Sequence, residues 1–278
     1  MYKIISDSSC DLKKDEIVDL NVSYVPFKIT IDGKEYVDDN DFEIGDFLKN
    51  MQASLNPIKT SCPAPYEFME EIEKNKDRDI YIVTITSKLS GSYNAAQVAV
   101  EDARQKFPGI KIGLIDSKTA SGGQTGVVLK LLDLLKETED FDTVMKGITD
   151  FVNEQTTLFV LESMQNLIKN GRIKKSAGLI ANVLNIRPIM GTKDGEIELY
   201  EMNRGMKKSL EKLALALEKI TNKKSFDRIC ISHVNAKERA EKLAKRFKDL
   251  YEVNEIVIRH TNGLSAGYAD IGGIVIGF

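Results

Sequence analysis

The sequence predicts an α/β fold made of two α/β domains, and three observations point to it. Short runs of β-branched and aromatic residues alternate with amphipathic helical stretches along the chain, which is typical of a largely parallel sheet covered by helices. The rhythm of this alternation changes near residue 155, so we expect domains at 1–155 and 156–278. A chain of 278 residues is long enough for two modest domains.

The first domain shows the alternation most clearly. The strand expected at 80–84 is compact and β-branched, and the helix expected at 123–136 carries its valines and leucines at helical spacing. Ligands of such sheets bind at loops that leave the carboxyl ends of strands. The other expected elements are strands at 3–5, 22–31 and 110–115, a hairpin turn at 32–34, and helices at 42–51 and 94–107.

The second half has longer helices and more varied strands. The helix expected at 207–221 has its apolar residues on one face. The helix expected at 176–185 is apolar nearly all round, so it is either buried in a core or lines an apolar cavity. The other expected elements are helices at 141–154 and 236–250, strands at 157–160, 227–232 and 255–260, a strand, turn and strand over 187–190 and 192–197, and a last strand at 274–278 that closes the sheet.

Composition excludes several functional classes. The formal net charge of −3 gives no basic surface for nucleic acid. No apolar run is long enough for an integral membrane segment, and the first residues are too short a run for a secretory signal. Three widely spaced cysteines and two histidines favour neither a disulfide framework nor a metal site. We therefore expect a cytoplasmic protein without a metal.

Hydroxyl-bearing residues gather in two loops. Thr60 and Ser61 precede two prolines, a pattern that fits either an ordinary helix start or a helix terminus that binds a carboxylate or phosphate. Ser90 and Gly91 follow the strand at 80–84, where the loop either caps the next helix or forms an oxyanion site. The chain has no GxSxG, GxGxxG or Walker A sequence, so nucleotide binding by those loops is disfavoured.

Basic residues and histidines supply further candidates. Arg172 lies in a basic turn, which is either solvated or an anion-recognition site, and Arg204 is a second candidate by the same reasoning. His260 follows a predicted strand and is either a site residue or a structural histidine. His233 also follows a strand, but that histidine or Asn235 is expected to cap the next helix.

Six short segments, spread in order along nearly the whole chain, carry a family resemblance. They are Asp7-Ser8-Ser9-Cys10-Asp11-Leu12, Thr60-Ser61-Cys62-Pro63, Ser87 to Tyr93, Ile115 to Ser121, Gly171-Arg172-Ile173 and Leu184 to Ile189. Taken together, they resemble the DegV family of bacterial fatty-acid-binding proteins. A last segment departs from the family pattern, because it reads His260-Thr261-Asn262-Gly263 where the family usually has His-Thr-Gly-Pro-Gly.

The resemblance implies two α/β domains with a ligand tunnel between them, and a carrier without catalytic residues or cofactor of its own. Its partners would be a long-chain fatty acid and a fatty acid kinase that phosphorylates the bound carboxylate. The family pattern maps carboxylate binding to Thr60, Ser61, Ser90 and Gly91, support of phosphoryl transfer at the tunnel mouth to Arg172, Arg204 and His260, and the acyl-chain tunnel to Ile180, Val183 and Leu184.

Two other functions stay open at this point. One is a serine hydrolase or acyltransferase that uses Ser90 with His260, although no acidic residue is obviously placed to orient the histidine. The other is a binder of a different amphipathic acid.

A long acyl chain gains about 0.8 kcal/mol for each buried methylene, which explains how a tunnel supplies affinity.

Overall fold

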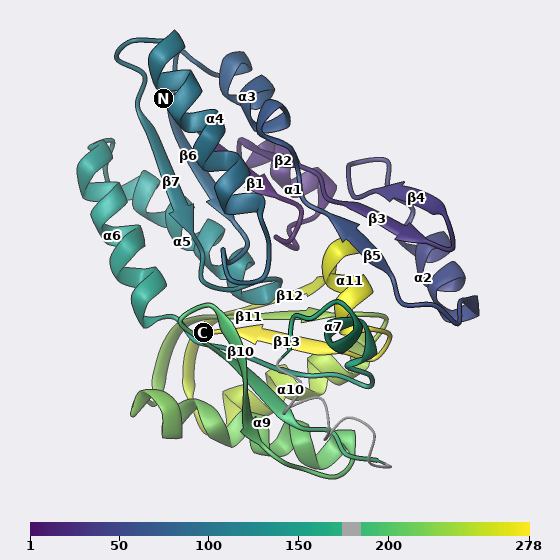
Figure 1. The fold of residues 1–278 in the computed structure, drawn as a ribbon. Helices are drawn as coiled ribbons and strands as arrows, with labels where there is room; N and C mark the ends of the chain where they lie inside the picture. The colour runs from purple at the N-terminus through teal and green to yellow at the C-terminus, as the bar shows by residue number, and fades with distance from the viewer. Residues whose placement is uncertain (174–184) are drawn as a thin grey trace.

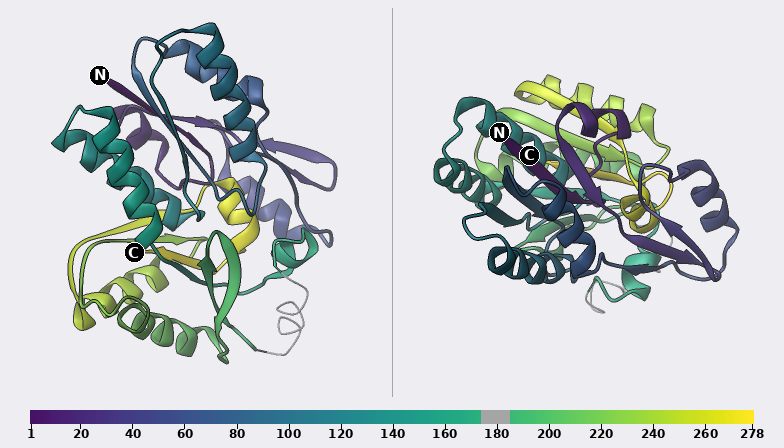
Figure 2. Two further views of the ribbon diagram at one scale, coloured as in Figure 1. Left: turned by 60° about the vertical axis from the view of Figure 1, so that its left-hand side comes forward. Right: turned by 90° about the horizontal axis from the view of Figure 1, so that it is seen from above.

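The computed structural model describes residues 1–173 and 185–278 of the chain. Two α/β units are stacked one above the other, and a small sheet lies to one side of them (Figures 1 and 2). Helix α6 (Phe141–Glu154) packs on the first unit, and the next strand, β8 (Thr157–Val160), joins the sheet of the second. We keep the domain boundary near residue 155 as a proposal.

The first unit contains a four-stranded parallel sheet with helices on both faces. Because neighbouring residues of a strand point to opposite faces, Ile4 packs against α5 and α6 whereas Ile5 packs against α3 and α4. The strands, in sheet order, are β2 (Val22–Val25), β1 (Tyr2–Asp7), β6 (Asp79–Thr84) and β7 (Ile112–Asp116). The remaining helices are α1 (Lys14–Asp19), α3 (Pro65–Lys74), α4 (Ser92–Lys106) and α5 (Gly122–Glu137).

The small sheet has three antiparallel strands and one covering helix. Its hairpin turns at Asp32 and Gly33, whose positive φ angles of 49° and 84° match the turn predicted there. Helix α2 (Ile44–Ala53) packs on this sheet through Phe47. The strands, in sheet order, are β4 (Lys34–Val37), β3 (Lys28–Ile31) and β5 (Lys59–Ser61).

The second unit contains a mixed six-stranded sheet in which only β11 and β12 run parallel. Helices α9 and α10 cover one face. The strands, in sheet order, are β10 (Glu196–Glu201), β9 (Ile189–Lys193), β8, β13 (Ile274–Gly277), β11 (Ser225–His233) and β12 (Glu252–His260). The helices are α7 (Gln165–Lys169), α9 (Met206–Thr221), α10 (Lys237–Leu250) and α11 (Gly263–Ala269).

The largely parallel sheet predicted from the first half of the chain is confirmed in the first unit. The second sheet, where the sequence has a different rhythm, is mostly antiparallel. One expectation about the second sheet needs correction. The last strand does not close the sheet at an edge, because β13 lies between β8 and β11. All four of its residues are buried, which suits a central strand covered on both faces.

An apolar layer joins the two units. Phe159 and Val275 project from the second sheet into the same core cluster as Ile29 and Phe47 of the small sheet and its helix. Polar contacts also cross the layer. Arg259 pairs with Glu16, with Nε 2.9 Å from a carboxylate oxygen, and Arg228 Nη1 lies 2.8 Å from Asp133 Oδ2. These contacts hold the units together around the layer in which the cavity lies.

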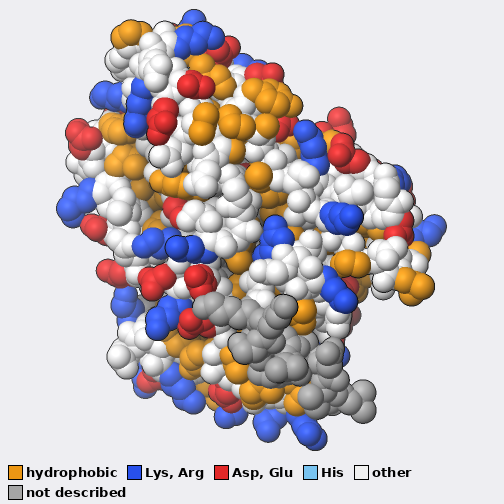
Figure 3. All heavy atoms as spheres, viewed as in Figure 1, with side chains coloured by type: hydrophobic (Ala, Val, Ile, Leu, Met, Phe, Trp, Pro, Cys, Tyr) orange, Lys and Arg blue, Asp and Glu red, His pale blue; other side chains and the backbone are white. Residues whose placement is uncertain are grey.

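The visible surface carries mixed charge. Lys and Arg side chains are interspersed with Asp and Glu in Figure 3 and do not gather into one basic field on this face. Among the described residues, no helix is long and apolar enough to cross a membrane.

Candidate functional site

A cavity of about 340 Å³ lies where the first unit, the small sheet and the second unit meet. Its volume is in the range of small-molecule sites. Residues from β5, from the loop after β6, from α11 and from the second sheet all contribute to its wall. The apolar side chains that line it are Phe27, Ile85, Leu89, Phe159, Leu161, Leu167, Ile197, Leu264 and Val275.

The two hydroxyl-bearing loops predicted from the sequence both line this cavity. Thr60, Ser61, Ser90 and Gly91 are all in its wall. The loops lie against one another, because a side-chain carbon on Gly91 would sit 3.3 Å from the sulfur of Cys62. Thr60 and Ser90 are half-buried, whereas Ser61 and Gly91 are exposed. The structure therefore brings four residues, 30 positions apart in sequence, to one solvent-accessible part of the cavity.

Thr60 and Ser61 do not cap a helix. They lie in the short strand β5, which pairs with β3, and helix α3 begins later, with Pro65 in its first turn. The cap of α3 is completed by Glu67, which accepts a hydrogen bond from the backbone of Ala64 at 2.7 Å. The hydroxyl of Thr60 is thus left available to the cavity.

The loop that carries Ser90 is held by a buried carboxylate. Asp7, at the end of β1, accepts hydrogen bonds from the backbone N–H of Ile85 at 2.9 Å and from the hydroxyl of Ser92 at 2.7 Å. Burial raises the pKa of Asp7, and these hydrogen bonds partly offset that effect. The hydroxyl oxygen of Ser90 accepts the N–H of Ser92 at 3.2 Å, so its own hydrogen can be donated to a ligand.

Helix α11 forms the opposite wall and was not predicted from the sequence. It contributes Leu264, Ser265, Tyr268 and Ala269 to the cavity. The hydroxyl of Tyr268 lies 2.8 Å from the hydroxyl of Thr60. Tyr268 is therefore a candidate site residue that sequence reasoning missed, because nothing in its local pattern links it to a residue 208 positions earlier.

Two further buried carboxylates fix the start of α11. Asp11 accepts the N–H of Asn262 at 2.9 Å, and Asp38 accepts the N–H groups of Gly263 and Leu264 at 2.7 and 2.8 Å. Burial raises the pKa of Asp38 to about 7, although both backbone donors favour the charged form. The loop that departs from the family pattern is thus tied to the first unit and the small sheet by two side chains.

Arg172 is the only one of the three predicted mouth residues in the cavity wall described here. It also lines a second pocket of about 400 Å³ together with the exposed residues Lys88 and Gly171. Its guanidinium donates to the backbone oxygen of Asn170. This position, between the cavity and the surface, suits a cation that meets an anionic group at the opening.

Three residues predicted to line an acyl-chain tunnel, Ile180, Val183 and Leu184, lie outside the described residues, as does most of the helix expected at 176–185.

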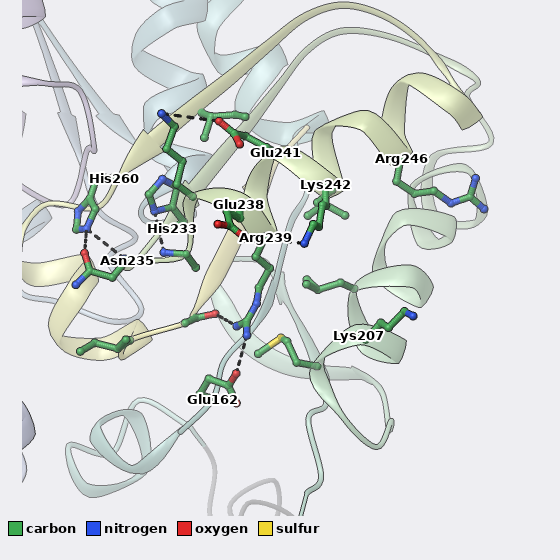
Figure 4. Close-up of a pocket in the computed structure, with 18 of the residues that line it drawn as sticks. Glu162, Lys207, His233, Asn235, Glu238, Arg239, Glu241, Lys242, Arg246 and His260 are labelled. Atoms are coloured by element: carbon green, nitrogen blue, oxygen red, sulfur yellow. Dashed lines mark hydrogen bonds and ion pairs between the residues drawn. The ribbon is translucent and has the colours of Figure 1, made fainter.

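His260 and Arg204 occupy other surfaces. Arg204 is exposed, next to the start of α9. His260 lines an open groove of about 1660 Å³ beside α9 and α10 (Figure 4). The Nε2 atom of His260 lies 2.9 Å from the side-chain oxygen of Asn235, and Nδ1 lies 2.9 Å from the backbone oxygen of Thr261. The structure does not bring these two residues together with Thr60 and Ser90.

The groove around His260 is lined by charged side chains of both signs. Glu162 pairs with Arg239 at 3.0 Å, and other Lys, Arg and Glu side chains extend from α9 and α10 (Figure 4). The neighbouring His233 accepts the N–H of Ala236 at 3.4 Å, directly before α10, but no side chain caps the helix itself. Burial and the nearby His260 lower the pKa of His233 to about 4.

The hydrolase arrangement finds no support in this geometry. Within the described part of the chain, no hydrogen bond joins Ser90 to His260, and each has other partners. In residues 1–173 and 185–278, no cluster of three or more His, Cys, Asp or Glu side chains is arranged to hold a metal ion.

Comparisons with known proteins agree with this picture. The chain is 34% identical over 280 residues to a DegV domain-containing protein of Streptococcus pneumoniae strain R6, covering 100% of this chain and 98% of the relative. It is 33% identical over 281 residues to a DegV domain-containing protein of Streptococcus gordonii, with coverage of 100% and 98%.

Three solved structures share the fold over 100% of this chain and 99% of theirs. A DegV family protein from Ruminococcus gnavus, described with vaccenic acid, has a TM-score of 0.92 at 33% identity. The Fatty Acid Kinase (Fak) B3 protein of Streptococcus pneumoniae, loaded with linoleic acid, has a TM-score of 0.91 at 33% identity. A DegV family protein from Eubacterium eligens, loaded with heptadecanoic acid, has a TM-score of 0.91 at 27% identity.

The match extends to the family as a whole. A family model described as DegV covers residues 1–277, and the relatives above are similar over their full length. Together with the two stacked α/β units and the cavity between them, these matches show that the chain belongs to the DegV family.

Proposed function

We propose that this chain is a cytoplasmic carrier that binds one long-chain fatty acid in the cavity between its two units and presents the carboxylate to a fatty acid kinase. The observation that carries the proposal is the pairing of an apolar wall with the hydroxyls of Thr60, Ser61 and Ser90. The fatty acids in related structures and the kinase name of one of them support the same ligand and partner.

The cavity has apolar side chains for the alkyl chain of a fatty acid and hydroxyl donors for its carboxylate. Buried alkyl carbons gain about 0.8 kcal/mol per methylene, and side chains such as Phe159 and Leu264 provide the apolar wall. A carboxylate out of bulk water must be hydrogen-bonded. Thr60 and Ser90 are half-buried and line the cavity, so their hydroxyls can donate hydrogen bonds to the carboxylate.

The proposed carboxylate site lies at an opening, which suits transfer to a second protein. Ser61 and Gly91 are exposed, and Arg172 reaches both the cavity and the outer surface. A cation at this position would offset the negative charge that accumulates during phosphoryl transfer. The kinase supplies the phosphoryl group in this scheme, and the carrier contributes binding and orientation. We propose that Arg204 and His260, on separate exposed surfaces, support the reaction by contacting the kinase.

A two-step assay tests this proposal. Delipidated protein should take up one equivalent of oleate or palmitate, and the loaded protein, with a purified fatty acid kinase and ATP, should form an acyl phosphate that hydroxylamine traps as a hydroxamate. Loaded carrier that gives no hydroxamate with any fatty acid kinase would remove the kinase role and leave lipid binding. Release of free product from an ester without kinase would favour the hydrolase alternative.

A further inference from the structure

We propose that Tyr268 is a positioning residue for the hydroxyl of Thr60, and that Asp38 holds the helix that carries it. This inference rests on the proposed binding of a carboxylate at Thr60. The inference pairs Thr60, the donor that contacts the ligand, with a second side chain, Tyr268. It also gives a role to Asp38, a buried acid outside the cavity wall.

The two hydroxyls form a pair. Thr60 Oγ1 and the Tyr268 oxygen are 2.8 Å apart, and both residues line the cavity. Neither hydroxyl has another hydrogen-bond partner in residues 1–173 and 185–278. Each hydroxyl has one hydrogen to donate. In the arrangement that we propose, Tyr268 donates its hydrogen to Thr60 Oγ1, and the hydrogen of Thr60 remains for an acceptor in the cavity.

This pair matches a carboxylate better than a lone threonine does. An ionised carboxylate has acceptor atoms only, and an isolated hydroxyl rotates among several directions. The bond to Tyr268 limits that rotation and, through hydrogen-bond polarisation, strengthens the remaining donor. The arrangement is therefore expected to favour an acid over an uncharged ligand of the same length.

The position of Tyr268 depends on α11, and Asp38 fixes the first turn of that helix. The carboxylate of Asp38 is 3% exposed and accepts the N–H groups of Gly263 and Leu264 at 2.7 and 2.8 Å. Asp38 follows β4 directly, and Thr60 lies in β5, which pairs with β3 on its other side. The small sheet and the residue that follows β4 thus hold α11 at two points, Thr60 and Asp38. Helix α11 lies next to β5 in Figure 1.

Gly263 makes the contact to Asp38 possible. A side-chain carbon at Gly263 would lie 2.5 Å from the ring of Phe42 and 2.7 Å from Asp38 Oδ1, so only glycine allows this approach. The backbone N–H of Gly263 is one of the two donors that Asp38 accepts at the start of α11.

Asn166 adds a third tie between the same segments. Its side-chain nitrogen donates to the backbone oxygen of Gly267 at 2.7 Å, next to Tyr268. Its side-chain oxygen accepts the N–H of Ile58 at 3.2 Å, two residues before Thr60. The backbone segments that carry both hydroxyls are thus joined by one amide, which supports a positioning role for the whole arrangement.

The test compares an acid with an alcohol of equal chain length. Delipidated wild type, Tyr268→Phe and the exposed control Tyr66→Phe would be titrated with palmitate and with hexadecanol. We expect Tyr268→Phe to bind palmitate about fivefold more weakly, as the loss of one hydrogen bond predicts. The loss for hexadecanol should be smaller, because its neutral oxygen accepts a weaker hydrogen bond than a carboxylate does. Tyr66→Phe should match the wild type with both ligands.

Combined variants test whether Asp38 and Tyr268 affect the ligand through the hydroxyl of Thr60. Adding Tyr268→Phe to Thr60→Val should cause no further loss of palmitate affinity, because the pair acts through one donor. Asp38→Asn should lower palmitate affinity about threefold and add nothing to Tyr268→Phe, whereas the exposed control Asp41→Asn should have no effect.

Two outcomes would overturn the inference. One is unchanged palmitate binding by Tyr268→Phe, and the other is an equal loss for palmitate and hexadecanol, which would indicate a packing role. If the wild type itself bound no palmitate, the proposed function would fail instead. Thermal unfolding of each variant separates a folding defect from a binding one, and Tyr268→Phe decides the question even if Asp38→Asn does not fold.

Discussion

The cavity between the units and the groove beside α9 and α10 differ in size and in chemistry. The groove, at about 1660 Å³, is nearly five times larger than the cavity, at about 340 Å³. It is open and lined by Lys, Arg and Glu, whereas the cavity combines apolar side chains with a few hydroxyls. A small amphiphile needs exclusion of water around its chain and donors at its head. The lining, more than the size, therefore supports the cavity as the proposed ligand site.

The largest expected effect comes from filling the smaller space. Ala120 lines the cavity and Ala236 lines the groove, so Ala120→Phe and Ala236→Phe form a matched pair. A phenyl ring in the cavity would displace three or four ligand methylenes, which predicts about a hundredfold loss of fatty-acid affinity. The groove variant should bind normally. Equal loss in both, with normal thermal unfolding, would contradict the assignment of the ligand to the cavity.

The next effect concerns the donors. Thr60→Val and Ser90→Ala each remove a hydroxyl proposed to bind the carboxylate, and a hydrogen bond to a charged group predicts a loss of about tenfold or more for each. Ser87, an exposed serine in the same loop that lies outside the cavity wall, provides the control variant Ser87→Ala. Calorimetric titration with oleate measures all three. A loss in the control as large as in Ser90→Ala would point to loop disruption.

A smaller effect separates the cavity wall from the outer surfaces. Arg172→Gln should lower kinase-dependent acyl-phosphate formation about tenfold and also weaken fatty-acid binding, because Arg172 lines the cavity. Arg204→Gln and His260→Gln should lower acyl-phosphate formation but leave binding unchanged, since both lie outside the cavity wall. Full acyl-phosphate formation by all three variants would refute the proposed support of phosphoryl transfer.

The smallest effect is a pH dependence of stability with opposite signs in the two regions. The pKa of His233 falls from its ordinary value of 6.5 to about 4 in the folded chain, so the unfolded chain binds more protons between these values and stability is lost as pH falls through that window. The pKa of Asp38 is raised from 3.8 to about 7, so stability is instead lost as pH rises through that range.

Urea unfolding between pH 4 and pH 8 measures both contributions. His233→Gln should flatten the loss on the acid side, and Asp38→Asn should flatten the loss toward neutral pH. A variant whose stability keeps the pH slope of the wild type would show that its residue does not cause that slope. The two variants thus test each region independently of any ligand.

Local patterns predicted much of the fold. The β-branched run at 80–84 is strand β6, and the leucines and valines spaced along 123–136 lie on helix α5. The strand β5 was missed because its three residues have no periodicity of their own, and it exists only through pairing with β3. The central place of β13 was missed for the same reason, since strand order is set by long-range pairing.

The candidate site was predictable where the sequence carried a motif and not where distant segments meet. Thr60 and Ser90 stood out as hydroxyls in loops, and both line the cavity. Tyr268 and Asp38 carried no local signal, because their roles depend on partners 208 and 225 positions away. The roles of Arg204 and His260 came from the family pattern alone, and they stay predictions.

Native mass spectrometry of the protein purified from a bacterial host, followed by denaturing extraction, tests the central claim most directly. We predict one bound fatty acid, of about 14 to 18 carbons, per protein chain, because one cavity holds one such ligand. The Ala120→Phe variant should contain none. A protein that is empty as purified and takes up neither added oleate nor palmitate would contradict the account.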